Sequence, residues 1–240
     1  MEWRTILFLS QDQVGIQEVI EKQDAHSLNQ KAFDLPSRLI AKIYLFRTIF
    51  RGSGYSFAND PDFMHVSTNP KYWDDVGVKF YTKYHGIDKQ HKEWAKLSVA
   101  GKPIIGPFGR EWLCPMRPNK RTGELEIPWT TLTNYPVQGT GADIMMIARI
   151  SFANRLKAVK GRSAFHGNVL MFLTVHDSIV IDVEDERDIQ LLTNMFHQVF
   201  DDLPMNIKRL FGFDWNVPME CETKVGPNLK DMKKVFRNDK

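Results

Sequence analysis

Cysteine is scarce in this chain of 240 residues, which contains only Cys114 and Cys221. The two lie far apart and lack metal-ligand spacing, so the sequence predicts neither a disulfide framework nor a cysteine-based zinc site. Long apolar runs are missing, which argues against a membrane span, and the first residues lack the pattern of a secretory signal. We therefore expect reduced thiols, no membrane partner and a cytoplasmic location.

A strong charge of either sign is also lacking. The chain has 32 lysines and arginines against 29 aspartates and glutamates, a formal net charge of +3. This mild excess is compatible with nucleic-acid binding but does not predict it, because local basic patches matter more than the total. With 42% hydrophobic and 25% charged residues, the composition indicates a globular protein of one large or two small domains.

Residues 169–183 predict a β-hairpin. Two apolar, β-rich runs flank the polar triplet His176-Asp177-Ser178. This arrangement would lift Asp177 to the tip of two buried strands, at the rim of a sheet. A His-Asp pair at a turn is commonly turn chemistry alone, because Asp bonds its own backbone there. Other segments of the chain favour a functional role for this turn.

Residues 38–51 predict a helix that follows Pro36 and ends before Gly52. Four of its residues recur at steps of four and so share one face: Arg38, Lys42, Phe46 and Phe50. Two cations followed by two rings suit a nucleoside triphosphate, whose phosphates need positive charge and whose base or sugar needs a flat surface. An amphipathic helix with two solvated cations is the simpler alternative.

The other expected elements follow from the same patterns. A helix is predicted over 12–22, and a break with a candidate N-cap at Asp24 follows it. Further helices are predicted over 72–100, as one or two helices, over 134–159 and over 184–210. Asp143 is expected near the start of the helix over 134–159, as a structural carboxylate. A final strand is expected over 215–225, followed by a loose lysine-rich tail from Lys230.

Five segments, in order, resemble the C-terminal part of a family A (DNA polymerase I-like) DNA polymerase. They are DAHSLNQ at 24–30, the fingers helix RLIAKIYLFRTIFRG at 38–52, TLTNYPVQGTGADIMMIARI at 131–150, the motif C sequence VHDS at 175–178, and MECETKVGPNLKD at 219–231. The first of them leans toward the bacteriophage members of the family, whose proteins would work in the bacterial host cytoplasm.

The resemblance implies an α+β fold, in which a mostly helical fingers subdomain accompanies a partial antiparallel palm sheet with the motif C hairpin. It divides the chain into the end of palm motif A at 1–10, the fingers over 11–105 and the C-terminal palm over 106–240. The implied activity is template-directed nucleotidyl transfer by a DNA-directed DNA polymerase, with primer-template DNA and deoxynucleoside triphosphates as partners.

The resemblance also implies roles for single residues. Contacts with the incoming nucleotide are expected from Glu2, His26, Arg38, Lys42, Phe46 and Phe50. Catalysis is expected to involve Asp177, Lys42 and Arg38. Contacts with DNA are expected from Arg51, Asn134, Gln138 and His176. Among these, Asn134 and Gln138 would match minor-groove acceptors that every base pair presents.

Nucleotidyl transfer of this kind uses two divalent metal ions about 3.5–4 Å apart. The resemblance makes Asp177 a ligand of two Mg²⁺ ions. MEWR at 1–4 resembles the end of motif A, so the Asp of that motif would precede Met1. We expect an N-terminal polymerase subunit to supply this ligand, the thumb and the rest of the palm, and the isolated chain to be inactive. A truncated reading frame would have the same sequence.

Several positions depart from the family pattern. Phe50-Arg51 stand where the family has Tyr-Gly, so Phe50 has no hydroxyl to bond Glu2, and Arg51 adds bulk and charge on the template side. Ser178 replaces the second acid of motif C. Phe46 is the variant that, in this family, tends to discriminate against dideoxynucleotides.

Two other functions remain open at this point. A single-subunit RNA polymerase typically has His-Asp-Ser in motif C, although Glu2 matches the residue that excludes ribose in DNA polymerases. A non-catalytic DNA-binding remnant would bind primer-template DNA with a steep salt dependence and would not synthesise DNA even with a partner.

Overall fold

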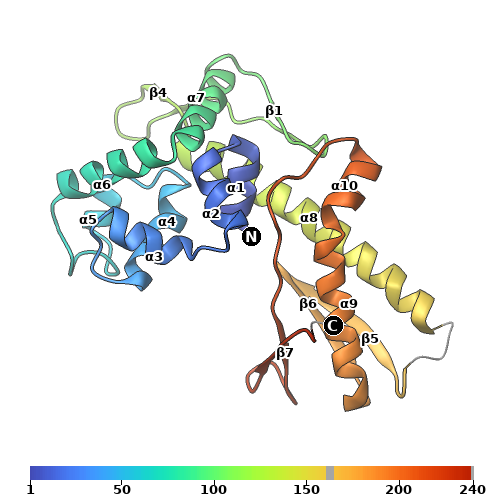
Figure 1. Ribbon diagram of the computed structural model, residues 1–240. Helices are drawn as coiled ribbons and strands as arrows, with labels where there is room; N and C mark the ends of the chain where they lie inside the picture. The colour runs from blue at the N-terminus through green and yellow to red at the C-terminus, as the bar shows by residue number, and fades with distance from the viewer. Residues whose placement is uncertain (161–164, 239–240) are drawn as a thin grey trace. The chain divides into compact units, whose positions relative to one another are not determined.

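A computed structural model describes residues 1–160 and 165–238 of the chain. The chain forms two compact units, Met1–Thr140 and Gly141–Lys240 (Figure 1). Helix α8 (Trp129–Lys160) contributes its first turns to the first unit and the rest to the second. The expected α+β class is confirmed, because helices accompany short antiparallel strand pairs. No helix in the described part of the chain is both long and apolar enough to span a membrane.

The first unit is mostly helical. Its helices are α1 (Glu2–Ser10), α2 (Gln13–Ile20), α3 (Ala25–Ala32), α4 (Arg38–Thr48), α5 (Gly54–Ala58), α6 (Pro70–Lys83) and α7 (His85–Val99). Strand β1 (Ile104–Ile105) pairs with β2 (Glu111–Trp112), and β3 (Arg117–Pro118) pairs with β4 (Leu125–Glu126), both antiparallel.

Several of these helices begin at a residue whose side chain accepts a hydrogen bond from the first turn: Asp12, Asp24, Ser37, Ser53 and Asn69. Such N-caps satisfy backbone N–H groups that have no partner inside the helix. The candidate N-cap at Asp24 is therefore confirmed. Asp12 does more than cap α2, because its second carboxylate oxygen accepts from the Gly86 N–H at 2.8 Å and so fixes the start of α7.

An aromatic core holds α3 to α6 together. Its rings are buried and belong to Phe33, Tyr44, Phe57, Phe63, Trp73, Phe80 and Tyr84. Tyr44 of α4 stacks on Trp73 of α6, with ring centroids 5.8 Å apart. Because α4 turns Tyr44 and its apolar neighbours inward, its opposite face is left exposed.

A buried polar network fixes α3 against α2 and α6. The Tyr84 hydroxyl lies 2.8 Å from the Glu18 carboxylate and 2.7 Å from the Asn29 amide oxygen. The Lys83 ammonium lies 2.9 Å from each of the same two side chains. Buried polar groups are tolerated when they are paired in this way, and the network holds in place the helix that carries His26.

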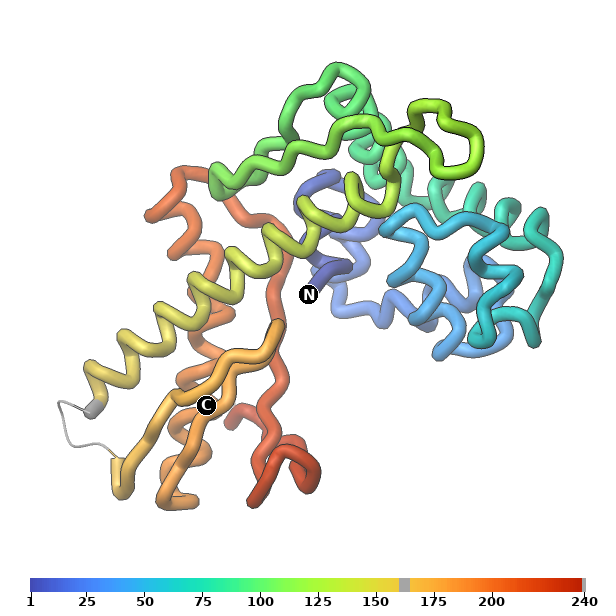
Figure 2. Tube along the Cα trace, turned by 180° about the vertical axis from the view of Figure 1, so that it is seen from behind, coloured from blue at the N-terminus to red at the C-terminus, as the bar shows by residue number. Residues whose placement is uncertain are grey.

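The second unit contains the motif C hairpin and a helical layer. Strand β5 (Val169–Val175) pairs with β6 (Ser178–Val183), followed by the 3₁₀ turn η1 (Glu186–Asp188), α9 (Ile189–Asp201) and α10 (Leu203–Phe211). The predicted hairpin is confirmed, with a register shift between Met171 and Leu173. The expectation of two buried strands at the rim of a sheet is wrong, because among the described residues the two strands pair only with each other and Val169 is their one fully buried residue. Figures 1 and 2 show α9 along one face of the hairpin. Phe152 of α8 meets Phe196 of α9 at 5.3 Å between ring centroids.

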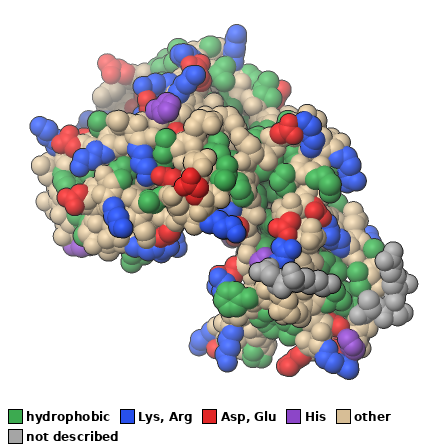
Figure 3. Space-filling model, in the orientation of Figure 1, with side chains coloured by type: hydrophobic (Ala, Val, Ile, Leu, Met, Phe, Trp, Pro, Cys, Tyr) green, Lys and Arg blue, Asp and Glu red, His purple; other side chains and the backbone are tan. Residues whose placement is uncertain are grey.

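Positive and negative side chains are intermixed over the face that Figure 3 shows, on either unit. This distribution agrees with the small net charge of the chain. The cations that matter for binding must therefore be identified one by one rather than from a single basic patch.

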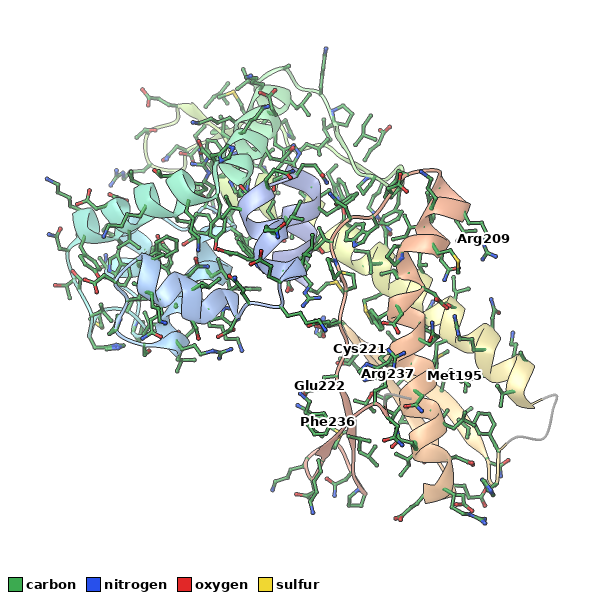
Figure 4. All side chains as sticks on the ribbon, in the orientation of Figure 1. Met195, Arg209, Cys221, Glu222, Phe236 and Arg237 are labelled. Atoms are coloured by element: carbon green, nitrogen blue, oxygen red, sulfur yellow. The ribbon has the colours of Figure 1, made fainter. Side chains whose placement is uncertain are left out.

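The predicted loose tail is wrong for the described residues after Lys230. Strand β8 (Lys233–Val235) pairs with β7 (Thr223–Val225), and the expected strand over 215–225 is limited to this last part. Arg237 pairs with Asp201 of α9, and the Gln190 side chain donates to the Phe236 carbonyl at 3.3 Å. Figure 4 shows Phe236 and Arg237 next to Glu222 and Cys221. Contacts distant in sequence therefore order this segment.

Two helix boundaries also differ from the prediction. Helix α8 begins at Trp129, because the Leu132 N–H already bonds the Pro128 carbonyl at 2.9 Å. Pro136 thus lies inside the helix, and Asp143 lies in its middle rather than near its start. The helix expected over 184–210 is divided into η1, α9 and α10, since Pro204 suits the first turn of a new helix but not a helix interior.

Candidate functional site

Helix α4 presents three of its four predicted site residues to solvent. Arg38, Lys42 and Phe46 are exposed, whereas Phe50 is buried and lies just beyond the last helical residue, Thr48. The two rings still touch edge to face, with centroids 5.4 Å apart. The stripe of two cations followed by aromatic rings is therefore present, and the buried Phe50 ring supports the exposed Phe46 ring.

His26 lies on α3 beside these cations. Burial is the largest cause that lowers its pKa below the ordinary histidine value, and the positive charges of Arg38 and Lys42 lower the pKa further. The Asp24 carboxylate acts in the opposite direction. The buried Nδ1 of His26 has no hydrogen-bond partner among the described residues. His26 is thus a neutral imidazole at neutral pH, with an enclosed ring nitrogen, in the field of two cations.

Arg38 is paired with Asp24 across the α3–α4 connection. The Arg38 Nε lies 2.6 Å from one carboxylate oxygen and its Nη2 lies 2.9 Å from the other. The Arg38 guanidinium holds the pKa of the Asp24 carboxyl far below its usual range. Within residues 1–160 and 165–238, Lys42 makes no ion pair, so the two cations of α4 differ in how freely they can accept a phosphate.

Arg51 has a different environment. Its φ of 60° is in the left-handed region, where glycine is favoured. Its guanidinium lies between the rings of Tyr81, at 4.4 Å, and Trp129, at 4.7 Å. Its Nη2 contacts Asp88 at 2.7 Å and its Nε donates to the His91 Nδ1 at 3.2 Å. Arg51 therefore ties the end of α4 to α6, α7 and the start of α8.

His91 can accept this hydrogen bond because burial lowers its pKa to about 3 and keeps the ring neutral. Sequence reasoning assigned no chemistry to the segment that carries Tyr81, Asp88 and His91. No local pattern marks these residues, since their shared partner, Arg51, is thirty or more residues away in the chain.

Asn134 and Gln138 lie one helical turn apart on α8, with Asn134 half-buried and Gln138 exposed. The neighbouring Gly139 permits a close approach, because a Cβ there would lie 2.3 Å from the Trp112 ring. The glycine in this segment thus lets β2 pack against the start of α8. Glu2, another predicted site residue of the first unit, is the first residue of α1.

His176 and Asp177 are the two predicted site residues that the second unit contains. They form the two-residue turn between Val175 and Ser178, with His176 at a φ of 51°. Both side chains are exposed, so Asp177 is free to meet a ligand at the tip of the hairpin.

A metal centre needs more than this tip provides. Mg²⁺ is usually held by one or two carboxylates together with substrate phosphates. In the described part of the chain, no three His, Cys, Asp or Glu side chains are grouped as metal ligands. Asp177 fits the role of one carboxylate in such a centre but does not fit a complete two-ion site.

Comparison with known proteins then decides the family. The family model described as DNA polymerase family A matches residues 1–231. This chain is a member of DNA polymerase family A. It is 23% identical to DNA polymerase I of Deinococcus radiodurans over 97% of the chain, and 25% identical to DNA polymerase I of Synechocystis sp. over 90% of the chain.

This family A chain spans 23% of the length of each of those two relatives. A shorter match, 29% identical over 45% of the chain, is to the thermostable DNA polymerase I of Thermus filiformis and covers 12% of that protein. The fold is similar to the POL domain of Pol1 from M. smegmatis, solved with DNA primer-template and dNTP. That similarity has a TM-score of 0.69 at 18% identity and covers 91% of this chain and 36% of the other.

Proposed function

We propose that this chain is the fingers and C-terminal palm of a DNA-directed DNA polymerase. The observation that carries the proposal is the exposed face of α4, where Arg38, Lys42 and Phe46 are arranged as a triphosphate and its nucleoside require. Family membership over residues 1–231 supports it. The division into motif A at 1–10, fingers over 11–105 and palm over 106–240 belongs to the same proposal.

The nucleotide would bind along α4. Arg38 and Lys42 offer fixed positive charge to the phosphates, and the His26 imidazole lies in their field. Phe46, backed by Phe50, offers a flat apolar surface to the sugar or base. Glu2 would exclude the 2′-hydroxyl of a ribonucleotide. These groups bind and orient the triphosphate, and they account for selection of a deoxynucleotide.

Primer-template DNA would meet α8 and the hairpin tip. Asn134 and Gln138 offer amide groups that suit the acceptors of the minor groove at any base pair. His176 would contact the primer end next to Asp177, and Arg51 would contact the template side. The POL domain of Pol1 from M. smegmatis, which has a similar fold, was solved with DNA primer-template and dNTP. This supports DNA and dNTP as partners here.

Bound Mg²⁺ ions would activate the primer 3′-oxygen and stabilise the leaving phosphates. Asp177 would hold them with one carboxylate, and Ser178 could orient a metal-bound water. A palm segment with the motif A Asp would supply the other carboxylate. The hairpin has room for such a segment, because its two described strands pair only with each other and expose Leu170, Phe172 and Val175.

Primer extension tests the proposal. A labelled primer-template is incubated with Mg²⁺ and the four dNTPs, first with this chain alone, then with a polypeptide that carries the upstream palm and the motif A Asp, and then with both. We expect extension only with both chains, and poor incorporation when ribonucleotides replace dNTPs. Extension by the chain alone would refute the need for a partner. Failure with a verified cognate partner would favour a non-catalytic DNA-binding remnant.

A further inference from the structure

Asp24 forms an ion pair with Arg38, one of the cations that the proposed function assigns to the nucleotide. Two nitrogens of the guanidinium face the two oxygens of one carboxylate, at 2.6 and 2.9 Å. This fork-to-fork geometry is the one in which arginine also binds a phosphate. A carboxylate and a phosphate therefore compete for the same edge of Arg38.

Asp24 cannot easily follow Arg38 if the arginine turns toward a ligand. The same carboxylate accepts from the Ser27 N–H at 3.2 Å and from the Ser27 hydroxyl at 2.5 Å, which fixes it at the start of α3. Arg38 is the first residue of α4 and has a long, flexible side chain. Release of the pair would thus occur by movement of the arginine.

A ligand can reach this pair from solvent. The Arg38 side chain is 56% exposed and the Asp24 side chain is 41% exposed. Lys42 and His26 lie close enough for their charges to influence one another, so an incoming polyanion would meet three basic groups and one opposing carboxylate. The carboxylate both masks Arg38 and repels the phosphates.

We propose that Asp24 is a counter-ion latch for Arg38, and that a nucleoside triphosphate must displace it before Arg38 can bind phosphate. This role rests on the proposed nucleotide site and adds a residue that sets the affinity of that site. Asp24 is a positioning residue that acts through Arg38. Because the pair is exposed, its opposition to binding is modest, about 1.5- to 5-fold in the dissociation constant.

Calorimetric titration of the full chain with Mg²⁺-dATP tests the latch. Asp24→Asn removes the charge but keeps an oxygen that can cap α3, and it is expected to tighten binding about 1.5- to 5-fold. Asp24→Ser, a second neutral cap, should do the same. Arg38→Gln should weaken binding, and in the Arg38→Gln background the gain from Asp24→Asn should fall to less than half.

Asp62→Asn is the matched control, because Asp62 pairs with Arg47 on the same helix at 3.3 Å. It should leave the affinity for dATP unchanged. A structural readout accompanies the titration: the Arg38 Nε–H resonance, identified by its loss in Arg38→Gln, should move both in Asp24→Asn and when dATP is added to the original chain.

The outcomes separate the latch from the nucleotide site. If Arg38→Gln weakens binding but both neutral Asp24 variants bind no more tightly than the original chain, the latch is refuted and the nucleotide site stands. If the original chain does not bind dATP, or Arg38→Gln has no effect, the nucleotide site on α4 is refuted together with the latch. The latch would also be overturned if Asp24→Asn increased the affinity for dATP by the same factor in the Arg38→Gln background as in the original chain.

Discussion

At His26, burial and neighbouring charges decide whether the imidazole carries a proton. In the chain without a ligand, the pKa of His26 is lowered because the residue is half-buried and lies near Arg38 and Lys42. A bound triphosphate would reverse the sign of that field. His26 would thus be neutral without the nucleotide and more readily protonated with it.

This reversal predicts a pH-dependent affinity for dATP. Because the pKa of His26 would rise on binding, a proton would be taken up with the ligand, so affinity should be highest at low pH and should fall across the range between the lowered free-state pKa and the higher bound-state pKa. Titrations across this range should show that fall, and His26→Gln should abolish it. His65→Gln, at an exposed histidine, is the control. A fall that persists in His26→Gln would contradict the assignment.

Phe46 predicts a second property at this scale. The residue is 46% exposed, and the resemblance to the family implies that Phe here discriminates against dideoxynucleotides. In the reconstituted enzyme, Phe46→Tyr should reduce that discrimination about tenfold or more. Competing incorporation of ddNTP and dNTP measures the ratio. Phe50→Tyr, which adds the same hydroxyl to the buried neighbour, should leave the ratio unchanged.

Among the elements, the hairpin and α4 could be predicted because their signals are local. Alternation, turn residues and capping residues all lie within the element they specify. The contacts of the segment with β8 and the partners of Arg51 could not be predicted in the same way. Each depends on residues far away in sequence, as when Arg237 pairs with Asp201. The Asp24–Arg38 pair was missed for the same reason, although the cap itself was expected.

Arg51 gives a prediction about the end of α4. Arg51→Ala loses the Asp88 ion pair and both ring contacts while keeping a left-handed backbone, so it should lower the free energy of unfolding by about 1–3 kcal/mol. Arg51→Gly loses the same contacts but relieves the backbone, and should be about 1 kcal/mol more stable than Arg51→Ala. Urea unfolding followed by tryptophan fluorescence measures both. Equal stability of the two variants would contradict this explanation.

Asp12 tests how α2 and α7 are joined. Asp12→Ala removes a helix cap and a buried acceptor for the Gly86 N–H, so it should lower the free energy of unfolding by about 2 kcal/mol. The same urea unfolding applies. Lys31→Ala, at an exposed residue of α3, should change stability by less than about 0.5 kcal/mol. A similar loss of unfolding free energy in both variants would show that the contacts of Asp12 with α2 and α7 have no special role.

At the scale of the whole molecule, the proposed chemistry is divided between two units. The residues proposed to bind the nucleotide belong to Met1–Thr140, and Asp177 belongs to Gly141–Lys240. Nucleotidyl transfer needs both groups at one substrate, with a further carboxylate that the described residues do not group with Asp177. Family membership could be inferred from motif order, whereas the arrangement of ligands around a metal could not.

The most direct measurement is single-nucleotide incorporation by the reconstituted pair of chains, with Asp177→Ala compared with Asp182→Ala. Asp182 is an exposed carboxylate on β6 of the same hairpin, so it controls for a change of charge and for folding. We predict that Asp177→Ala lowers the rate about a hundredfold or more, that Asp182→Ala retains it, and that the incorporated nucleotide follows the template base. A full rate with Asp177→Ala would contradict the central claim that this carboxylate serves the polymerase reaction.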